Sequence, residues 1–420
     1  SQRVYADHEA SQYLKKALDL IKHLPQSSER DRLELELLIL LGPSLTVIQG
    51  YASSEVGAVY RRARLLCEFA ESLDSFFPVL WGSWVFHVVR AELQAAKELS
   101  SRFFQLATGQ ENPTIRAAGH FTMGCTLFHL GVFKEARTHF EEALARYEPE
   151  QFPFLLHSFG PELGVFCQSY LAHVLWILGL PRQASEQASN ALSRAKQLAH
   201  PFSTALALDY LALLHQFQGD ALAARELTRE TASICDEYGF RYYLAWTPIL
   251  RGWALVQDEQ PEQGAREIRQ GLDAFQSMEA RLRRPYYSML LAQACQRAGS
   301  AEEGLRVITE AIALVEKSQE SWSQSELHRT RGELLSQSGE WREAEASFQH
   351  ALSIARLQGA PIFELRAALA LSRLWMERMK PAQAITLLRK TCTKFSELAE
   401  TMDHRQAQCL LHNLVEQEAL

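Results

Sequence analysis

Apolar residues along this chain recur at intervals of three and four positions, the spacing that places them on one face of an α-helix. The segment from Val132 to Tyr147 shows the pattern well, because Phe133, Ala136 and Phe140 fall on one face and charged residues occupy the other. Segments that alternate apolar and polar residues at every second position, as half-buried strands do, are nearly absent. The pattern therefore predicts an all-α protein.

Small residues recur with a period of about 40 residues through the second half of the chain. Glycines mark this period at Gly179, Gly219, Gly299 and Gly339. The period places one point every 40 residues, at positions 179, 219, 259, 299, 339 and 379. Five residues after each point comes a small residue, at Ala184, Ala224, Gly264, Gly304, Ala344 and Ala384. Seven residues before the points the small set recurs as Ala172, Ala212, Gly252, Ala292, Gly332 and Ser372. Small side chains at fixed spacing let two helices approach closely, so each repeat is expected to be a pair of packed helices in a solenoid.

The same spacing of small and apolar residues places the second helix of each pair. These helices are expected at Ala10/Leu14/Ala17, Val56/Tyr60/Ala63, Ala95/Leu99, Ala136/Phe140/Ala143, Ala184/Ala188/Ala191, Ala224/Thr228/Thr231, Gly264/Ile268/Gly271, Gly304/Ile308/Ala311, Ala344/Phe348/Ala351 and Ala384/Leu388/Thr391. The pattern predicts about ten helix pairs in one continuous array over residues 1–420, with N-terminal repeats in 1–147 and regular repeats in 167–420. The chain starts without a methionine, and we expect a fragment or processed form that begins within a repeat.

Residues 148–166 depart from this rhythm. Pro149, Pro153, Gly160 and Pro161 lie among phenylalanines in this segment, a composition unsuited to an uninterrupted helix. One interpretation is an irregular, aromatic-rich loop that caps the core between repeats. The alternative is a loop that a rigid scaffold displays for binding a ligand or partner.

Composition and charge argue against several classes of protein. The net charge of -7 and the pI near 6.1 do not suit a protein that binds nucleic acid directly. The short basic cluster of Arg281, Arg283 and Arg284 is interpreted as a solvated turn between repeats. No run approaches the ~20 apolar residues that cross a bilayer, and no signal peptide begins the chain. We therefore expect no membrane association. The cysteines are scattered and form no Cys-x-x-Cys pair, which is typical of a reduced, cytoplasmic protein.

The segment from His120 to Tyr147 carries an ordered set of small and large residues. Small, large, small, small, aromatic and small side chains stand at Gly124, Leu127, Gly131, Ala136, Phe140 and Ala143. This order resembles the tetratricopeptide repeat, and the segment from Leu327 to Ala355 matches it equally well. The resemblance implies a right-handed superhelical solenoid of helix hairpins, in which the first helix of each pair lines the concave surface. Repeats of about 40 residues exceed the usual ~34, which adds turns to the helices.

Longer stretches, which together span most of the array, carry a second resemblance. They are Leu33–Cys67, Phe76–Ser100, His200–Leu208, Leu250–Val256 and Arg284–Ala294. These stretches resemble the C-terminal sensor arrays of bacterial multidomain signal-transduction ATPases, of the maltose-activator-like and adenylate-cyclase-associated kinds. In that family the array senses an inducer or a partner and releases the ATPase from inhibition. The resemblance implies upstream ATPase and effector domains on the same polypeptide, although this chain has no Gly-x-x-x-x-Gly-Lys-[Ser/Thr] loop of its own.

The resemblance also indicates which residues face the groove. They lie one and four positions after, or three and six positions before, the central small residue of each first helix. Carried onto this chain, these offsets give the candidate residues Trp84, His87, Phe128, Ser169, His173, Trp176, Asp209, Gln216, Trp246, Trp253, Tyr286, Gln293, Glu326, Arg329 and Glu333, together with Cys125, Leu213, Val256, Gln296, Ser336, Arg373 and Met376. Aromatic and polar side chains together on a concave wall suit a small ligand or an extended peptide. An aromatic residue at helical spacing is also often part of a core, so the prediction rests on the set.

No catalytic motif occurs in the sequence. It has no His-Glu-x-x-His, no Gly-x-Ser-x-Gly and no glycine-rich dinucleotide turn. We therefore predict that the protein is not an enzyme and uses no cofactor or metal.

The leading functional hypothesis is a sensor and interaction module of a larger signalling protein. It would bind a small-molecule inducer or a protein segment in the groove and regulate the attached domains, including transcription effectors. The alternative hypothesis is a purely structural adaptor that holds protein partners together.

Overall fold

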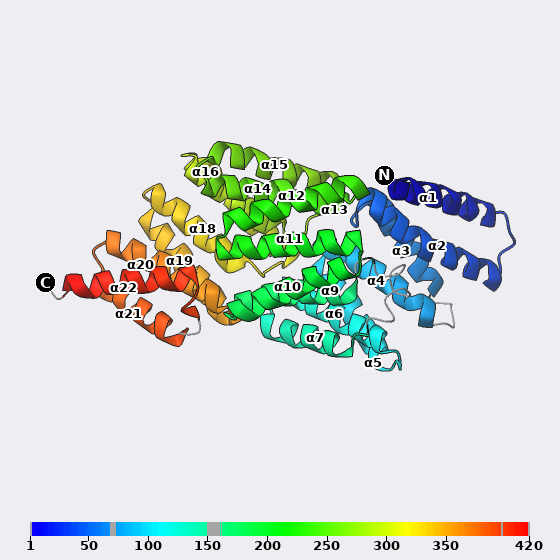
Figure 1. Cartoon of the computed structure of the whole chain (residues 1–420), viewed down its shortest axis with the longest axis horizontal. Helices are drawn as coiled ribbons and strands as arrows, with labels where there is room; N and C mark the ends of the chain where they lie inside the picture. The colour runs from blue at the N-terminus through cyan, green and yellow to red at the C-terminus, as the bar shows by residue number, and fades with distance from the viewer. Residues whose placement is uncertain (1, 68–72, 149–159, 161, 396–397, 419–420) are drawn as a thin grey trace.

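The computed structural model describes residues 2–67, 73–148, 160, 162–395 and 398–418 (Figure 1). In these ranges the regular structure is helical, as the apolar spacing predicts, and consecutive helices pack as antiparallel hairpins. The outer helices, which are the second of each pair, are α1 (Gln2–Ile21), α3 (Ser54–Cys67), α5 (Leu93–Thr108), α7 (Phe133–Arg146), α10 (Pro181–Gln197), α12 (Ala221–Tyr238), α15 (Pro261–Ser277), α17 (Ala301–Ser318), α19 (Trp341–Gln358) and α21 (Pro381–Lys394). Each contains the triplet of small and apolar residues from which it was predicted.

The inner helices are the first of each pair. They are α2 (Ser28–Gln49), α4 (Leu73–Val89), α6 (Pro113–His129), α9 (Leu163–Ile177), α11 (Pro201–Gln218), α14 (Trp246–Gln257), α16 (Arg284–Arg297), α18 (Gln324–Gln337) and α20 (Pro361–Glu377), with α22 (Met402–Glu418) after the last pair. A single turn of helix, α13 (Arg241–Leu244), directly precedes α14. Of the irregular segment, residues 149–159 and 161 lie outside the described residues.

Small residues bring the two helices of a pair into close contact. A Cβ atom added to Gly264 of α15 would lie 2.5 Å from the carbonyl oxygen of Gly252 on α14, and one on Gly252 would lie 2.6 Å from that of Gly264. A Cβ on Gly332 of α18 would likewise lie 2.5 Å from the ring of Phe348 on α19. These separations exclude any larger side chain without movement of the backbone or ring. The periodic small residues are therefore explained by helix packing.

The glycines of the 40-residue period end the inner helices. They adopt left-handed backbone conformations, with φ of +80° at Gly179, +81° at Gly219, +77° at Gly299 and +80° at Gly339. Glu259 and Met379 take the same conformation, with φ of +59° and +56°, at the points where the period lacks glycine. Glycine suits this conformation because it has no Cβ to clash with the backbone.

The array coils tightly enough for one turn to contact the next. The backbone N–H groups of Arg281 and Leu282 donate to the carbonyl oxygen of Val89, at 2.8 and 3.0 Å. The N–H of Trp322 donates to the carbonyl oxygen of His129 at 3.2 Å. These bonds join the ends of α4 and α6 to two loops of later repeats, which we call the α15–α16 loop (residues 278–283) and the α17–α18 loop (residues 319–323).

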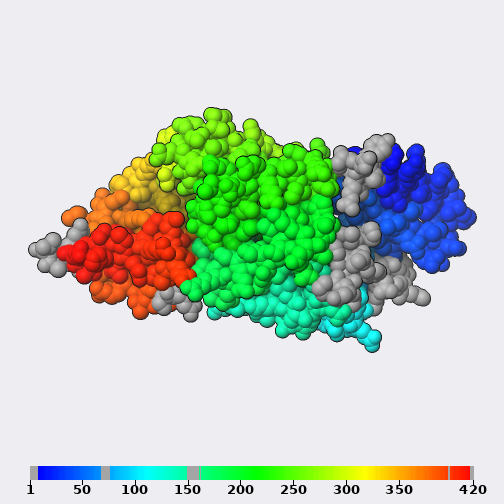
Figure 2. Space-filling model, viewed as in Figure 1, coloured from blue at the N-terminus to red at the C-terminus, as the bar shows by residue number. Residues whose placement is uncertain are grey.

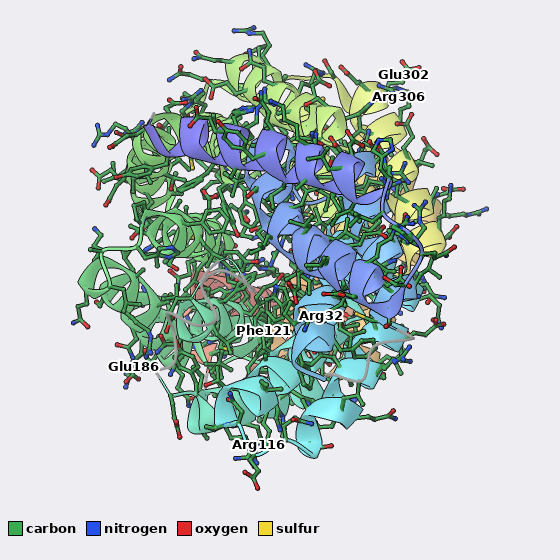
Figure 3. All side chains as sticks on the ribbon, turned by 90° about the vertical axis from the view of Figure 1, so that its right-hand side faces the viewer. Arg32, Arg116, Phe121, Glu186, Glu302 and Arg306 are labelled. Carbon is green, nitrogen blue, oxygen red and sulfur yellow. The ribbon has the colours of Figure 1, made fainter. Side chains whose placement is uncertain are left out.

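The two faces of the coil differ in composition. Seen along the long axis, Phe121 of α6 lies toward the centre, whereas Glu186 and Arg306 lie at the periphery (Figure 3). In the space-filling view the C-terminal helices adjoin α10 along one side of the molecule (Figure 2), where Arg182 forms an ion pair with Glu400. Within the described residues, no helix is both long enough and apolar enough to span a membrane.

Candidate functional site

A cavity of about 970 Å³ opens on the inner side of the array toward its C-terminal end. Side chains of α14, α16, α18, α20 and α22 line it, with two from the outer helix α19, and we call it the polar groove. Amide and guanidinium groups dominate its wall, at Gln257, Gln293, Gln296, Arg297, Gln337, Arg373 and Gln406. Trp253 and Trp341 add aromatic surface. The groove thus combines hydrogen-bond donors and acceptors with flat apolar rings.

Ion pairs hold the floor of the polar groove in place. Arg329 bonds to Glu326 at 2.9 Å and to Glu333 at 2.5 Å. Arg366 of the next inner helix bonds to Glu326 at 3.3 Å and to Asp403 of α22 at 3.0 Å. Burial alone would raise the pKa of Glu326, but the two guanidinium groups outweigh burial and lower it. Glu326 therefore stays ionised and links α18 to α20, and Arg366 extends this link to α22.

Arg366 also connects the polar groove to the previous turn of the coil. Its guanidinium donates to the carbonyl oxygen of Phe217 on α11 at 2.6 Å. Beside this contact lies a smaller cavity of about 140 Å³, where the hydroxyl of Tyr286 donates to Gln216 Oε1 at 2.5 Å. Gln293 borders both cavities and donates to Thr330 at 3.2 Å. The two cavities adjoin each other and share Gln293, Arg366 and Asp403 in their linings.

The structure brings the later groove residues predicted from sequence together. Trp253, Gln293, Arg329 and Glu333 line the polar groove. Gln216, Tyr286 and Glu326 line the adjoining smaller cavity. His87 lies apart from both, near the end of α4, where its Nδ1 lies 2.6 Å from Glu92 Oε2.

The earlier groove residues lie in a filled interior and not on an open wall. Those buried within the coil are Trp84, Phe128, Ser169, His173, Trp176, Asp209 and Trp246. The α15–α16 and α17–α18 loops lie against the inner helices here. The interior is therefore filled in this region, whereas we expected an open groove. Arg283, interpreted above as part of a solvated turn, is 0% exposed, so that interpretation was wrong for this residue. A binding role for the buried set stays a prediction.

Several of these buried side chains have partners within the chain. The Nε1–H of Trp84 donates to Thr126 Oγ1 at 2.9 Å, joining α4 to α6. His173 Nε2 donates to the carbonyl oxygen of Tyr210 at 2.8 Å, and its ring stacks on the Tyr210 ring. Burial lowers the pKa of His173 well below its usual range, which keeps the ring neutral. Burial also raises the pKa of Asp209 well above its usual range.

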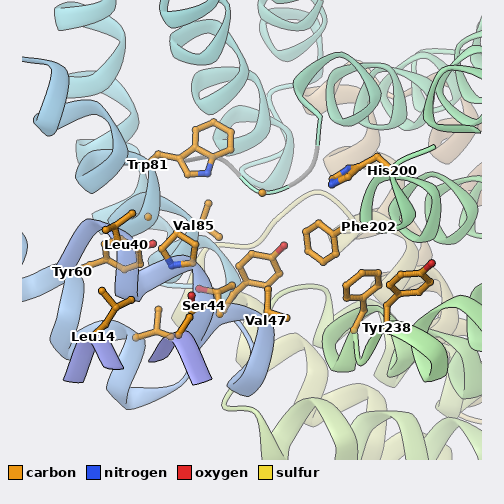
Figure 4. A pocket seen from close by; sticks show the side chains of 18 of the residues that line it. Leu14, Leu40, Ser44, Val47, Tyr60, Trp81, Val85, His200, Phe202 and Tyr238 are labelled. Atoms are coloured by element: carbon orange, nitrogen blue, oxygen red, sulfur yellow. The ribbon is translucent and has the colours of Figure 1, made fainter. Parts of the chain in front are cut away.

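An apolar cavity of about 590 Å³ lies near the N-terminal end of the array (Figure 4). Leu14, Leu40 and Tyr60 form one side of it, and Phe202 and Tyr238 face them from α11 and α12. Its lining also includes Gly160, next to residues outside the described ranges. We therefore base the functional proposal on the polar groove, whose lining is described throughout.

Sequence reasoning missed part of the polar groove. Arg366 lies six before Ser372, so the offset of six carried one repeat further would have included it, whereas the offset of one already gives Arg373. Gln406 occupies the corresponding position in α22, but no small residue marks that repeat. The spacing of small residues therefore did not predict that α22 would contribute to the groove.

Comparisons with known proteins agree with this architecture. The tetratricopeptide repeat family matches residues 122–148. An uncharacterized protein of Rhizobium meliloti (strain 1021) is 25% identical over 371 residues, which is 86% of this chain. The chain spans only 35% of the length of that relative.

Solved structures show the same fold at low sequence identity. A Rap protein complexed with Competence and Sporulation Factor superposes with a TM-score of 0.61 at 14% identity, over 85% of this chain and 99% of that chain. NprR in complex with its cognate peptide NprX superposes with a TM-score of 0.52 at 11% identity, over 77% of this chain and 87% of that chain. The chain is thus an all-helical, tetratricopeptide-like solenoid with the fold of these regulators.

Proposed function

We propose that this chain is a non-catalytic sensor module that binds an extended protein segment in the polar groove and regulates domains attached to the same polypeptide. The observation that carries the proposal is the groove itself, a recess of about 970 Å³ lined by side chains of successive inner helices. Repeat arrays use such concave surfaces to bind partners.

The chemistry of the groove favours a peptide over an apolar ligand. Glutamine side chains such as Gln293, Gln296 and Gln406 each offer one acceptor and two donors, which match the C=O and N–H groups of an extended backbone. Arg297 and Arg373 add donors suited to a carboxylate on the same segment. Trp253 and Trp341 offer flat faces for apolar side chains.

The ion-pair floor provides a route from binding to a change in the coil. Arg366 simultaneously contacts α18, α22 and the carbonyl oxygen of Phe217 on α11. A bound segment that draws Arg366 or Arg329 toward itself therefore alters contacts between two turns of the array. Because such packing contacts are bistable, a small shift can change the pitch of the coil.

Two similarities support the sensor role. NprR, which shares the fold, was solved in complex with its cognate peptide. The Rhizobium meliloti relative extends well beyond the aligned region, and the sequence resembles the sensor arrays of signal-transduction ATPases. The upstream effector domains of that resemblance are the proposed recipients of the signal.

The test is selection of random peptides on the full chain, followed by binding measurements on variants. Peptides enriched by the wild-type chain are expected to bind the Gln293→Ala/Arg373→Ala variant at least tenfold more weakly. Arg306→Ala is the matched control, because Arg306 lies on the outer helix α17 and pairs only with Glu310 on the same surface. Equal affinity of all three proteins for the enriched peptides would reject the groove as the binding site.

The alternative, a structural adaptor, gains support from the filled interior between α4 and α14. A coil that is closed by its own loops offers a stable outer surface to partners. An adaptor would retain one stoichiometric partner in a pull-down from both the wild type and the Gln293→Ala/Arg373→Ala variant. A sensor would lose its partner in the variant.

A further inference from the structure

The most unusual side chain in the described structure is Arg283, at the end of the α15–α16 loop. It is fully buried and takes a left-handed conformation with φ of +62° directly before α16. None of its guanidinium nitrogens has a well-formed hydrogen bond among the described residues. Arginine carries its charge at all physiological pH values, so this is a desolvated cation without an anion bonded to it.

Aromatic rings surround the guanidinium group of Arg283. Its central carbon lies 5.2 to 5.6 Å from the ring centroids of Phe128, Tyr170, Tyr210, Trp246 and Trp322. Four of these rings come from α6, α9, α11 and α14, which are consecutive inner helices, and the fifth comes from the α17–α18 loop. The cation therefore lies on the axis of the coil. We call these five rings the aromatic cage.

Glu320 bonds to the backbone of the α15–α16 loop and not to the guanidinium group of Arg283. Its Oε1 accepts from the backbone N–H of Arg283 at 2.8 Å and from Trp322 Nε1–H at 3.0 Å. It forms no ion pair with the guanidinium group in this structure. The side-chain charge is held by ring faces, which attract cations through their quadrupoles.

Few hydrogen bonds hold the α15–α16 loop to the previous turn, although the side chains of Met278, Ala280 and Leu282 are buried. The loop makes two hydrogen bonds to Val89, and Glu279 pairs with Arg90 at 2.7 Å near the surface. Exposed ion pairs of this kind contribute little and are screened by salt. The cage and the cation come from different repeats: four of the rings belong to the inner helices α6, α9, α11 and α14, whereas Trp322 and Arg283 belong to loops of later repeats.

We propose that the aromatic cage is a binding site for a guanidinium group, occupied by Arg283 of the chain itself in the closed coil and by an arginine of a basic partner segment when the loop withdraws. Five rings around one point are a poor solution for packing alone, because an apolar residue would fill the same space without the desolvation of a charge. A ring enclosure of this kind selects planar cations. The site is separate from the polar groove, so it stands or falls independently of the proposed function.

The first experiment empties the cage and offers it a small cation. Arg283→Ala is expected to gain about 2 °C in Tm with about 10 mM N-ethylguanidinium, and to gain nothing with the neutral isostere N-ethylurea. Wild type and Arg284→Ala, whose half-buried neighbouring side chain lies outside the cage, are expected to show no gain with either compound. A folded Arg283→Ala protein that responds equally to both compounds, or to neither, overturns the proposal.

The second experiment keeps Arg283 and loosens its loop. Glu279→Ala removes the pair with Arg90 and the hydrogen bond from the Ser54 N–H, and it truncates no buried side chain. It therefore decides the matter even if Arg283→Ala fails to fold. A short acetylated peptide, Gly-Arg-Gly-Arg-Gly, is expected to bind Glu279→Ala two- to fivefold more tightly than wild type, and more tightly than its citrulline counterpart. Equal binding of the arginine and citrulline peptides to Glu279→Ala would contradict a cation site in the coil.

Discussion

The middle of the array and its C-terminal end use the same inner-wall positions in opposite ways. Between α4 and α14 these positions are buried, and two of them, Phe128 and Trp246, face Arg283 of a later loop. From α14 to α22 the equivalent positions line an open recess with polar side chains. The comparison teaches that position within a repeat does not decide whether a residue is exposed. What the coil places opposite that position decides it.

The difference originates in where the inner helices begin. After the left-handed residues Ala199 and Gly359, a proline starts the next helix within two residues, at Pro201 and Pro361. After the left-handed residues Glu279 and Gln319, the helices begin only at Arg284 and Gln324. The intervening residues are free to cross the axis of the coil and fill it. Proline at a first helical position favours the earlier start.

The largest contrast is expected for charge reversal of two arginines. Arg283→Glu places an anion among ring faces that repel it, and should cost about 5 kcal/mol of unfolding free energy or open the coil. Arg297→Glu, on the wall of the polar groove and exposed, should change stability by less than about 0.5 kcal/mol. Urea unfolding together with the radius of gyration in solution measures both. Similar losses in the two variants would remove the distinction between the regions.

Truncation of two tryptophans should give the next largest difference. Trp322 is fully buried against Phe128 and Tyr286, so Trp322→Ala should destabilise by about 4 kcal/mol through cavity formation. Trp341 lies half-buried beside the polar groove, and Trp341→Ala should cost no more than about 1.5 kcal/mol. Thermal and urea denaturation report these values. A larger loss for Trp341→Ala would show that the groove is the more tightly packed region.

The filled region should also respond to pH through Glu320. Burial raises the pKa of Glu320 from 4.5 to about 7, although the bonds from Arg283 and Trp322 oppose the rise. The folded state thus binds this proton more tightly than the unfolded state, so its stabilising effect is fully present below about pH 4.5 and is lost as pH rises through about 7. The neighbouring His129 acts in the opposite direction, because burial lowers its pKa well below 6.5 and acid then destabilises the fold.

Glu320→Gln isolates this contribution. The variant is expected to lose up to about 3 kcal/mol of pH dependence between pH 4.5 and 7, while the acid loss from His129 remains. Urea titrations at closely spaced pH values measure the slope. An unchanged slope in that window would mean that Glu320 is ionised in the folded coil.

The sequence predicts those features of the fold and site that depend on contacts within one repeat, and not those that depend on contacts between turns of the coil. The outer helices and the close approach of Gly252 to Gly264 depend on neighbours within one repeat, so a period of small residues was enough to place them. The burial of Arg283 depends on the pitch of the coil, which brings Val89 against Leu282. Sequence spacing contains no direct record of that pitch. The predicted residues therefore line a cavity where the coil is open and are buried where it is filled.

The smallest expected effect lies in the turns that both regions share. Met379 is 86% exposed and holds a left-handed backbone, so Met379→Gly should stabilise the protein by about 0.5–1 kcal/mol. Gly339→Ala, at the same point of the previous repeat and with no atom near its missing Cβ, should destabilise it by about 1 kcal/mol. Thermal denaturation of both variants tests the assignment of the 40-residue period to helix ends. A stabilising Gly339→Ala would refute it.

The coil is closed in its middle and open at its C-terminal end, and cysteine labelling tests this difference most directly. Ser336→Cys places a thiol in the polar groove, and Ser169→Cys places one at a buried position of α9, while the native exposed Cys409 serves as the internal standard. We predict that a maleimide labels Cys409 and the Ser336→Cys thiol at similar rates, and the Ser169→Cys thiol at least about a hundredfold more slowly. Rapid labelling at position 169 in the folded protein, or protection at position 336, would contradict it.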